Sequence, residues 1–321
     1  MSQPTEISSQ SMKDRVAATS IAPRVIEDDS ISRRPARSFW RQSLGELRRN
    51  PAAVASAIIL GCLILMAIFA PAIQLITHTT PIQQNLLNTY GPPSRQNLLG
   101  TDELGRDTLT RLVYGARVSL GVGFLAVAVA LAIGGVIGLT AGFYGRWVDD
   151  VLMRIVDVVL AIPAIFLYIL MAILFRPNAI TLALIIASLS WAALARLVRA
   201  EVLSLRTRDF VLAARSIGAR DNRIIFRHLL PNALQVVIVA ASLGIGQVVL
   251  VEAALDFLGL GIQQPTPSWG DMLSNAEVYF THSVWLVVLP GLMIFLTVIS
   301  CNVLGNALRD AFDPRLRGRR A

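Results

Sequence analysis

Few residues of this 321-residue chain have the types and the spacing that chemistry would require. Glu252 and Asp256 are the clearest pair, since they lie one helical turn apart near the end of a long apolar block. Ionisable residues at membrane depth are costly and often functional. Two interpretations of this pair remain open: the carboxylates line the mouth of a path through the molecule, or they lie in the hydrated interface. Gln247 either faces the same path or joins two helices by hydrogen bonds.

No arrangement for catalysis or metal binding accompanies this pair. The chain has no G-x-x-x-x-G-K-[ST] loop and its single lysine is Lys13, which excludes ATP binding of the P-loop kind. The three histidines fall in three different segments, and the two cysteines lie inside apolar runs. We therefore expect no catalytic residue, no metal ligand and no cofactor in this chain.

The apolar residues are gathered into long blocks. The chain is 54% hydrophobic and only 16% charged, whereas soluble domains carry about a quarter charged residues. A membrane span needs about 20 apolar helical residues. Six blocks are long enough: 52–73, 118–141, 151–175, 179–198, 233–255 and 284–304. The sequence predicts an all-α polytopic membrane protein with six transmembrane helices, and no cleaved signal peptide, because the first block begins only after Pro51.

Arginines mark the predicted orientation of these spans. They cluster before the first span, in the 199–232 connection and after the sixth span, whereas 256–283 contains neither lysine nor arginine. Cytoplasmic loops carry the excess of basic residues. Both termini and the 199–232 loop are therefore predicted to be cytoplasmic, with 74–117 and 256–283 outside. This placement accounts for the net charge of +8 without a nucleic-acid partner.

The 201–232 loop has a helical pattern of its own. Asp209 can begin a short helix whose apolar face carries Phe210, Ala213, Ala214 and Ile217. Gly218 follows where a helix end favours a residue without a Cβ. A second helix is predicted from Asp221, with Ile225 among its apolar residues, and ends near Pro231. Two short helices joined at a glycine form a compact knob, whose apolar face packs on other helix ends or enters a groove of a partner.

Two further spacings predict contacts between or within the spans. Gly134, Gly138 and Gly142 recur every fourth residue in the second span, which places a stripe of glycine on one face and allows another helix to approach closely. Arg154 and Asp157 in the third span are three residues apart, so an ion pair within one helix is expected.

The loop also resembles a known family. Ala213-Ala214, then Gly218, then His228-Leu229-Leu230-Pro231 is similar to the Glu-Ala-Ala loop of binding-protein-dependent ABC importer permeases. Leu212 stands at the motif's glutamate position and His228 at its isoleucine position, so no ionic contact is assigned at Leu212. The resemblance implies that the loop inserts into a cleft of an ATP-binding subunit. The residues implied in this coupling are Asp209, Phe210, Ala213, Ala214, Arg215, Gly218, Ala219, Ile225, His228, Leu230 and Pro231.

A second set of motifs narrows the resemblance. Leu99 to Asp107 reads LGTDELGRD, and Phe257-Leu258-Gly259-Leu260-Gly261 precedes Pro267-Ser268-Trp269-Gly270. Together these resemble the second permease subunit of the dipeptide/oligopeptide importer family, over roughly residues 38–316.

The motif before the second span has two interpretations. Its members are Gly100, Thr101, Asp102, Gly105, Arg106 and Asp107. They either form an outward collar that touches the binding protein or cap a helix that leads into the second span. Capping explains most of them, with Thr101 and Asp102 at the helix start and Arg106 in reach of Asp102.

The resemblance implies a type I ABC importer permease fold, similar to MetI. The expected parts are a disordered cytoplasmic tail (1–38), a segment with the first transmembrane helix and outer loop (39–98), a five-helix permease core (99–308) and a basic cytoplasmic tail (309–321). Its implied location is the cytoplasmic (inner) membrane of a bacterium or archaeon.

The implied partners are a second homologous permease, two ATP-binding subunits that bind ATP and Mg²⁺, and an extracytoplasmic solute-binding protein. The implied activity is import of di- or oligopeptides by alternating access, with Glu252 and Asp256 as candidates to receive a peptide's amino terminus. Nickel complexes or glutathione are alternative cargoes within the family, and a non-transport membrane scaffold is an alternative outside it.

Overall fold

The computed structural model describes residues 39–312, and the predicted 1–38 tail and most of the 309–321 tail lie outside that range. The described residues fold into helices joined by loops, and no strand occurs among them beyond one isolated bridge between Thr101 and Asp107. The elements are α2 (Phe39–Arg49), α3 (Pro51–Ile68), α4 (Ala70–Thr77), η1 (Leu86–Asn88), α5 (Thr108–Tyr144), α6 (Arg146–Ala161), α7 (Ala164–Phe175), α8 (Ala179–Leu205), α9 (Asp209–Ser216), α10 (Asp221–Ile224), η2 (Ile225–Leu229), α11 (Leu230–Phe257), η3 (Asp271–Leu273), α12 (Ala276–His282) and α13 (Trp285–Phe312).

Five helical runs within 39–312 are long and apolar enough to cross a membrane: α3, α5, α8, the continuous run Asp221–Phe257 and α13. The pair α6 and α7 also qualifies, bent by 78°, so six spans result if this pair is one. The all-α, polytopic class predicted from the sequence is confirmed. The third predicted span is not a single helix, because Pro163 and the residue before it both disfavour a continuing helix.

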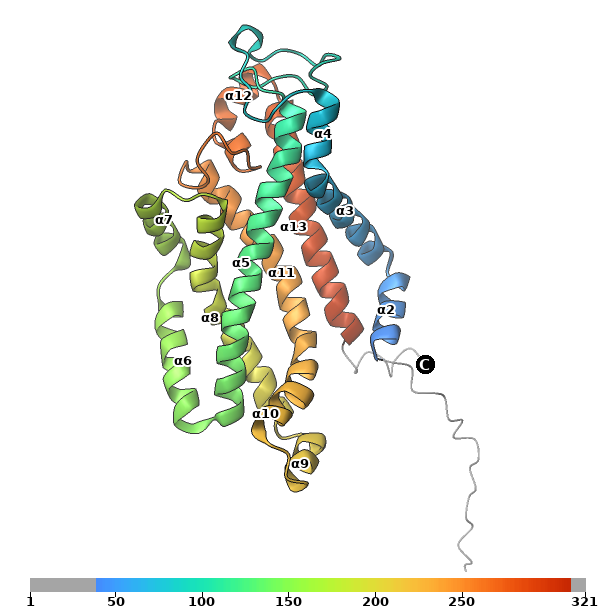
Figure 1. Cartoon of the computed structure of the whole chain (residues 1–321), viewed down its shortest axis with the longest axis vertical. Coiled ribbons are helices and arrows are strands. Elements are labelled where there is room, and N and C mark those ends of the chain that lie inside the picture. Colours follow the sequence, from blue (N-terminus) through green and yellow to red (C-terminus); the bar gives the residue numbers. More distant parts are fainter. Residues whose placement is uncertain (1–38, 313–321) are drawn as a thin grey trace, which may run out of the picture. The chain divides into compact units, whose positions relative to one another are not determined.

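The bundle is organised around α5. This helix packs against α8 along most of its length, while α11 packs against α13 and α5, and α13 against α3 (Figure 1). The predicted glycine stripe lies in the α5–α8 contact. A Cβ on Gly138 would approach the Ala195 carbonyl oxygen to 2.6 Å, and one on Gly134 would approach the Trp191 carbonyl oxygen equally closely. The small residues therefore set the distance between the two backbones.

The ion pair predicted within the third span is wrong. Asp157 accepts a hydrogen bond of 2.6 Å from Arg196 of α8 and forms no ion pair with Arg154. Asp149 also pairs with α8, because both of its carboxylate oxygens accept hydrogen bonds from the Arg199 guanidinium. Because α6 lies beside α8, a partner on the neighbouring helix is nearer than one on the same helix.

Candidate functional sites

The first candidate site is a knob formed by residues 206–229, which contain α9, α10 and η2. Val211 and Ala214 of α9 pack with Ile224 and Leu229 into a core that includes Phe143 at the end of α5. Figure 1 shows this knob at the end of the bundle where α5 turns into α6, far from α12. The knob is therefore attached to the ends of the long helices by a core of its own.

Gly218 ends α9 as the sequence predicts. Its φ of 77° is in the left-handed region, its N–H donates to the Arg215 carbonyl, and the Ala219 N–H donates to the Ala214 carbonyl. This is the Schellman arrangement, in which glycine is favoured because it has no Cβ. Asp209 is the first residue of α9, but its side chain makes no capping hydrogen bond, and Arg208 occupies the N-cap position.

The second short helix predicted in the loop does not end near Pro231. After α10 the chain forms the π-turn η2 and then continues as α11 without a break, so that one run extends from Asp221 to Phe257. Proline has no N–H and crowds the preceding turn of an α-helix. The wider turn at Ile225–Leu229, closed by the Leu230 N–H on the Ile225 carbonyl, accommodates Pro231 within the run.

The predicted coupling residues divide between two faces of the knob. Ala214 and Ile225 are buried, and Ala219, His228 and Leu230 are half-buried. The remaining predicted residues are exposed: Asp209, Phe210, Ala213, Arg215, Gly218 and Pro231. The predicted apolar face was expected to pack on other helix ends or to enter a groove of a partner. Only Ala214 of this face packs within the chain, whereas Phe210, Ala213 and Ile217 are exposed, and Ile217 is 85% exposed. The face that packs uses Val211, which the helical spacing did not single out.

The second candidate site is the 100–111 cluster at the opposite end of the bundle, which contains the predicted outer-face motif. Its centre is Asp102, which accepts from the Nε of Arg106 at 2.7 Å and lies 3.3 Å from the Nε of Arg111. Arg106 also contacts Glu103 at 2.6 Å. Asp102, Arg106 and Arg111 are almost fully buried and Glu103 is half-buried, so the charges of the first three depend on their partners rather than on water.

The helix start predicted at Thr101 and Asp102 is wrong. The helix begins at Thr108, and Asp107 caps it by accepting from the Thr110 N–H at 2.8 Å. Thr101 instead donates to the Asn88 carbonyl, and Asp102 closes a turn through the N–H groups of Leu104 and Arg106.

The two glycines of this motif hold left-handed turns. Gly100 has φ 78° and Gly105 has φ 68°. A Cβ on Gly105 would overlap the Asn85 carbonyl. The Asn85 N–H in turn donates to the Leu104 carbonyl. The loop after α4 therefore packs directly on the motif.

Arg111 joins this cluster to a distant segment. Its NH2 group lies 2.8 Å from Asp271, and Asp271 in turn accepts at 3.4 Å from Gln264. Trp269, which is fully buried, donates from its ring nitrogen to the Leu112 carbonyl at 3.0 Å. Sequence reasoning missed Arg111 and Asp271 as partners, although the Pro-Ser-Trp-Gly motif that ends at Gly270 marked the segment.

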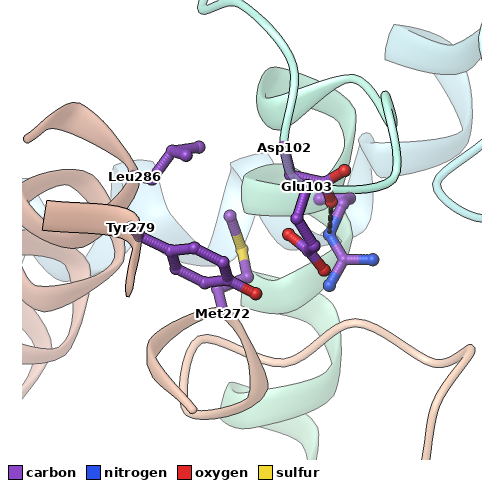
Figure 2. Close-up of a pocket in the computed structure, with 6 residues that line it drawn as sticks. Asp102, Glu103, Met272, Tyr279 and Leu286 are labelled. Carbon is purple, nitrogen blue, oxygen red and sulfur yellow. Dashed lines mark ion pairs between the residues drawn. The ribbon is translucent and has the colours of Figure 1, made fainter. Parts of the chain in front are cut away.

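A small pocket opens beside the cluster. Figure 2 shows the Tyr279 ring beside Met272, with its hydroxyl directed toward the carboxylate of Glu103, and Asp102 and Leu286 complete the labelled lining. Burial is the largest cause that raises the pKa of Tyr279, and the negative charges of Glu103 and Asp102 add to it. The hydroxyl therefore keeps its proton over the physiological range.

Glu252 and Asp256 lie together inside the protein. Glu252 is 0% exposed and accepts from the Ser119 hydroxyl at 3.0 Å, while Asp256 accepts from the Ile262 N–H at 2.6 Å and from the Ser268 hydroxyl. In this structure the pair opens onto neither a mouth nor an exposed interface. Gln247 is exposed on a different face of α11, because nine residues at about 100° each separate it from Asp256 by half a turn.

The comparison with known proteins decides the family. Residues 134–318 match the family described as binding-protein-dependent transport system inner membrane component, and residues 38–93 match the N-terminal TM domain of oligopeptide transport permease C. This chain belongs to that permease family. The resemblance inferred from the Ala-Ala-x3-Gly loop is confirmed, and the chain is a permease subunit of an ABC importer.

Relatives of this permease match over nearly their full length. The dipeptide transport system permease protein DppC of Alkalihalophilus pseudofirmus is 44% identical, with 87% of this chain and 91% of that protein covered. The oligopeptide transport system permease protein OppC of Bacillus subtilis is 37% identical at the same coverages. The glutathione transport system permease protein GsiD of Pectobacterium atrosepticum is 39% identical, with 91% and 95% covered.

A solved structure of the inward-facing MetNI methionine ABC transporter aligns with a TM-score of 0.46 and 20% identity, and covers 62% of this permease and 96% of that chain. Family membership of the permease implies an inner-membrane location and an ATP-binding partner.

Proposed function

We propose that this permease is one of two homologous, non-catalytic membrane subunits in an importer of di- or oligopeptides. Two ATP-binding subunits supply the hydrolysis with their own ATP and Mg²⁺, and an extracytoplasmic solute-binding protein delivers the cargo. The termini and the knob face the cytoplasm of a bacterium or archaeon. The observation that carries this proposal is the two-sided knob, one side built into the helix bundle and the other side apolar and exposed.

The exposed side of the knob has the composition of a docking surface. Phe210, Ile217 and Phe226 are large apolar residues that remain exposed within one short segment. Contiguous exposed apolar residues mark interaction sites. The membrane interior is an unsuitable contact for them, because the arginines of the same segment would have to enter it as well. An ATP-binding subunit is the partner that the family supplies at this position.

The buried side of the knob provides a route into the membrane helices. A displacement of α9 would be transmitted to α5 and α8, because its buried residues pack in one core with Phe143, Val198 and Val202. Movement of α10 reaches the far end of the bundle along the run Asp221–Phe257, where Asp256 is bonded to the segment that carries Trp269. This connection supports coupling between the cytoplasmic partners and the outward end.

The cargo assignment rests on the relatives. Their names specify dipeptides, oligopeptides and glutathione, all short peptides. The exposed face of α11, with Gln247, is the candidate for the translocation path. The 100–111 cluster is the candidate contact for the binding protein. Glu252 and Asp256 are buried in this conformation and reach cargo only if the outward-open state exposes them.

Replacement of Ile217 by Asp tests the docking. A charge at the centre of an apolar interface should weaken assembly with the ATP-binding subunits by about tenfold or more, because central contacts carry most of the binding free energy. The measurement is co-purification of those subunits and uptake of a labelled dipeptide by reconstituted vesicles. Leu87→Asp is the matched control, since Leu87 is 100% exposed at the other end of the bundle. Equal assembly of Ile217→Asp and wild type would refute the docking role.

A further inference from the structure

A hollow of about 760 Å³ lies between the knob and the turn that joins α5 to α6. Three of its lining residues are arginines from three different segments, Arg146, Arg206 and Arg215, and one is acidic, Asp221. The other lining residues are Phe143, Tyr144, Thr207 and Leu212. Three guanidinium groups against one carboxylate give the hollow a positive field that a phosphate group would complement.

The three arginines form no ion pair among residues 39–312, whereas Arg106, Arg111, Arg196 and Arg199 each pair with a carboxylate. Arg206 donates to the Gly142 carbonyl at 3.0 Å, and the Arg215 guanidinium lies 5.4 Å from the centre of the Phe143 ring. Both contacts hold a guanidinium at the hollow and leave N–H donors available. Arg146 is exposed and has φ 51°, an uncommon backbone angle for a residue with a side chain.

The residues beside the hollow are of the kinds found at the depth of lipid headgroups. Tyr144 and Trp147 are exposed at the end of α5 and the start of α6, and such aromatic residues gather at the membrane–water interface. From Trp147, α6 continues with the exposed apolar residues Val151, Ile155 and Val158, a face suited to acyl chains. The hollow therefore adjoins a lipid-facing helix on one side and the knob on the other.

We propose that this hollow binds the phosphate headgroup of an anionic phospholipid. Arg146 and Arg215 donate to the phosphate oxygens, Arg206 adds charge from the α8 side, and the acyl chains lie along α6. Basic pockets between transmembrane helices bind anionic headgroups in this way. The orientation proposed above assigns the lipid to the inner leaflet, but binding in detergent does not depend on that orientation. Failure of the lipid site would therefore leave the docking role of the knob intact.

The test is native mass spectrometry of the full chain in detergent, titrated with phosphatidylglycerol or with phosphatidylcholine of the same acyl chains. We expect the wild type to retain phosphatidylglycerol preferentially. Arg146→Gln with Arg215→Gln should reduce that retention by about thirtyfold, because each arginine near a lipid surface contributes about fivefold. The control Arg220→Gln with Arg223→Gln removes the same charge from two exposed arginines outside the hollow and should leave retention unchanged.

Three results would overturn the proposal. Equal losses in the two double variants would mean general charge attraction, and full displacement by millimolar inorganic phosphate would mean a site for free phosphate. Release of the lipid when the ATP-binding partner is added would assign the hollow to that protein. If the double variant unfolds, as judged by its thermal midpoint, Arg146→Gln alone provides the test, since the Arg146 side chain makes no hydrogen bond or ion pair that it would remove within 39–312.

Discussion

The buried charges of the 100–111 cluster show how individual side chains hold distant segments together. Arg111 is 3% exposed and lies between Asp102, nine residues before it, and Asp271, from which four of the six predicted spans separate it in the sequence. Removing one partner from a buried ion pair costs more than the pair contributes, because the remaining charge is left without compensation. Asp102 retains Arg106, whereas Asp271 has no other arginine within 39–312.

Arg111→Met is therefore expected to lower the free energy of unfolding by about 3 kcal/mol, mainly through the unpaired Asp271. Thermal or denaturant unfolding of the detergent-solubilised chain measures the change. Combining it with Asp271→Leu should recover part of the loss, since no charge is then left unpaired. Arg95→Met, at an exposed arginine of the loop before α5, should change stability by less than about 0.5 kcal/mol. A similar effect at both arginines would contradict the pairing.

At this scale the sequence predicts local contacts and fails for distant ones. The reach of Arg106 to Asp102 follows from a spacing of four residues and is confirmed. The contact between Arg111 and Asp271 follows only from the way α5 and the segment after α11 meet, which no local spacing encodes. The same limit explains why Arg154 was chosen for Asp157 in place of Arg196.

Among the helices, the α5–α8 contact is the one whose geometry depends most directly on residue size. Gly134, Gly138 and Gly142 face α8, whereas Gly135 on the same helix has no atom within 4 Å of the position of a Cβ. The stripe was predictable because its period matches a helix face. The 78° bend at Pro163 and the continuous π-turn before Pro231 were not, since proline permits several outcomes and neighbouring helices select among them.

Gly138→Ala should separate α5 from α8 and destabilise the bundle by about 1–3 kcal/mol, the usual cost of an overfilled contact. Gly135→Ala, on a side of α5 that does not contact α8, should be neutral or stabilising by up to about 1 kcal/mol because alanine favours the helix. Unfolding midpoints of the two variants in one detergent make the comparison. Equal stability of Gly138→Ala and Gly135→Ala would contradict the close contact between α5 and α8 at Gly138.

For the molecule as a whole, the distribution of arginine predicts which end faces the cytoplasm. The 206–229 knob carries Arg206, Arg208, Arg215, Arg220, Arg223 and Arg227, whereas 256–283 carries none. Basic residues are retained on the cytoplasmic side during insertion. The helix arrangement puts the knob and the 100–111 cluster at opposite ends, so one labelling experiment tests the orientation of both (Figure 1).

In a background with both native cysteines replaced by serine, Gln96→Cys should react with a membrane-impermeant maleimide in intact cells. Ser216→Cys, on the exposed side of the knob, should react only after the membrane is permeabilised. Both positions are exposed in the chain alone, so in cells that lack the ATP-binding subunits access is limited by the membrane rather than by burial. The reverse pattern would place the knob outside and exclude its contact with ATP-binding subunits.

The uninterrupted helix from Asp221 to Phe257 also limits how the chain can change in length. Each residue turns a helix by about 100°, so one inserted residue between the knob and Glu252 would rotate that carboxyl out of the interior or the knob away from its core. A loop can accept an inserted residue without moving the helices on either side of it. This helix cannot, because an insertion would rotate one end against the other. The π-turn at Ile225–Leu229 is the place where the helix already contains one residue more than an α-turn holds.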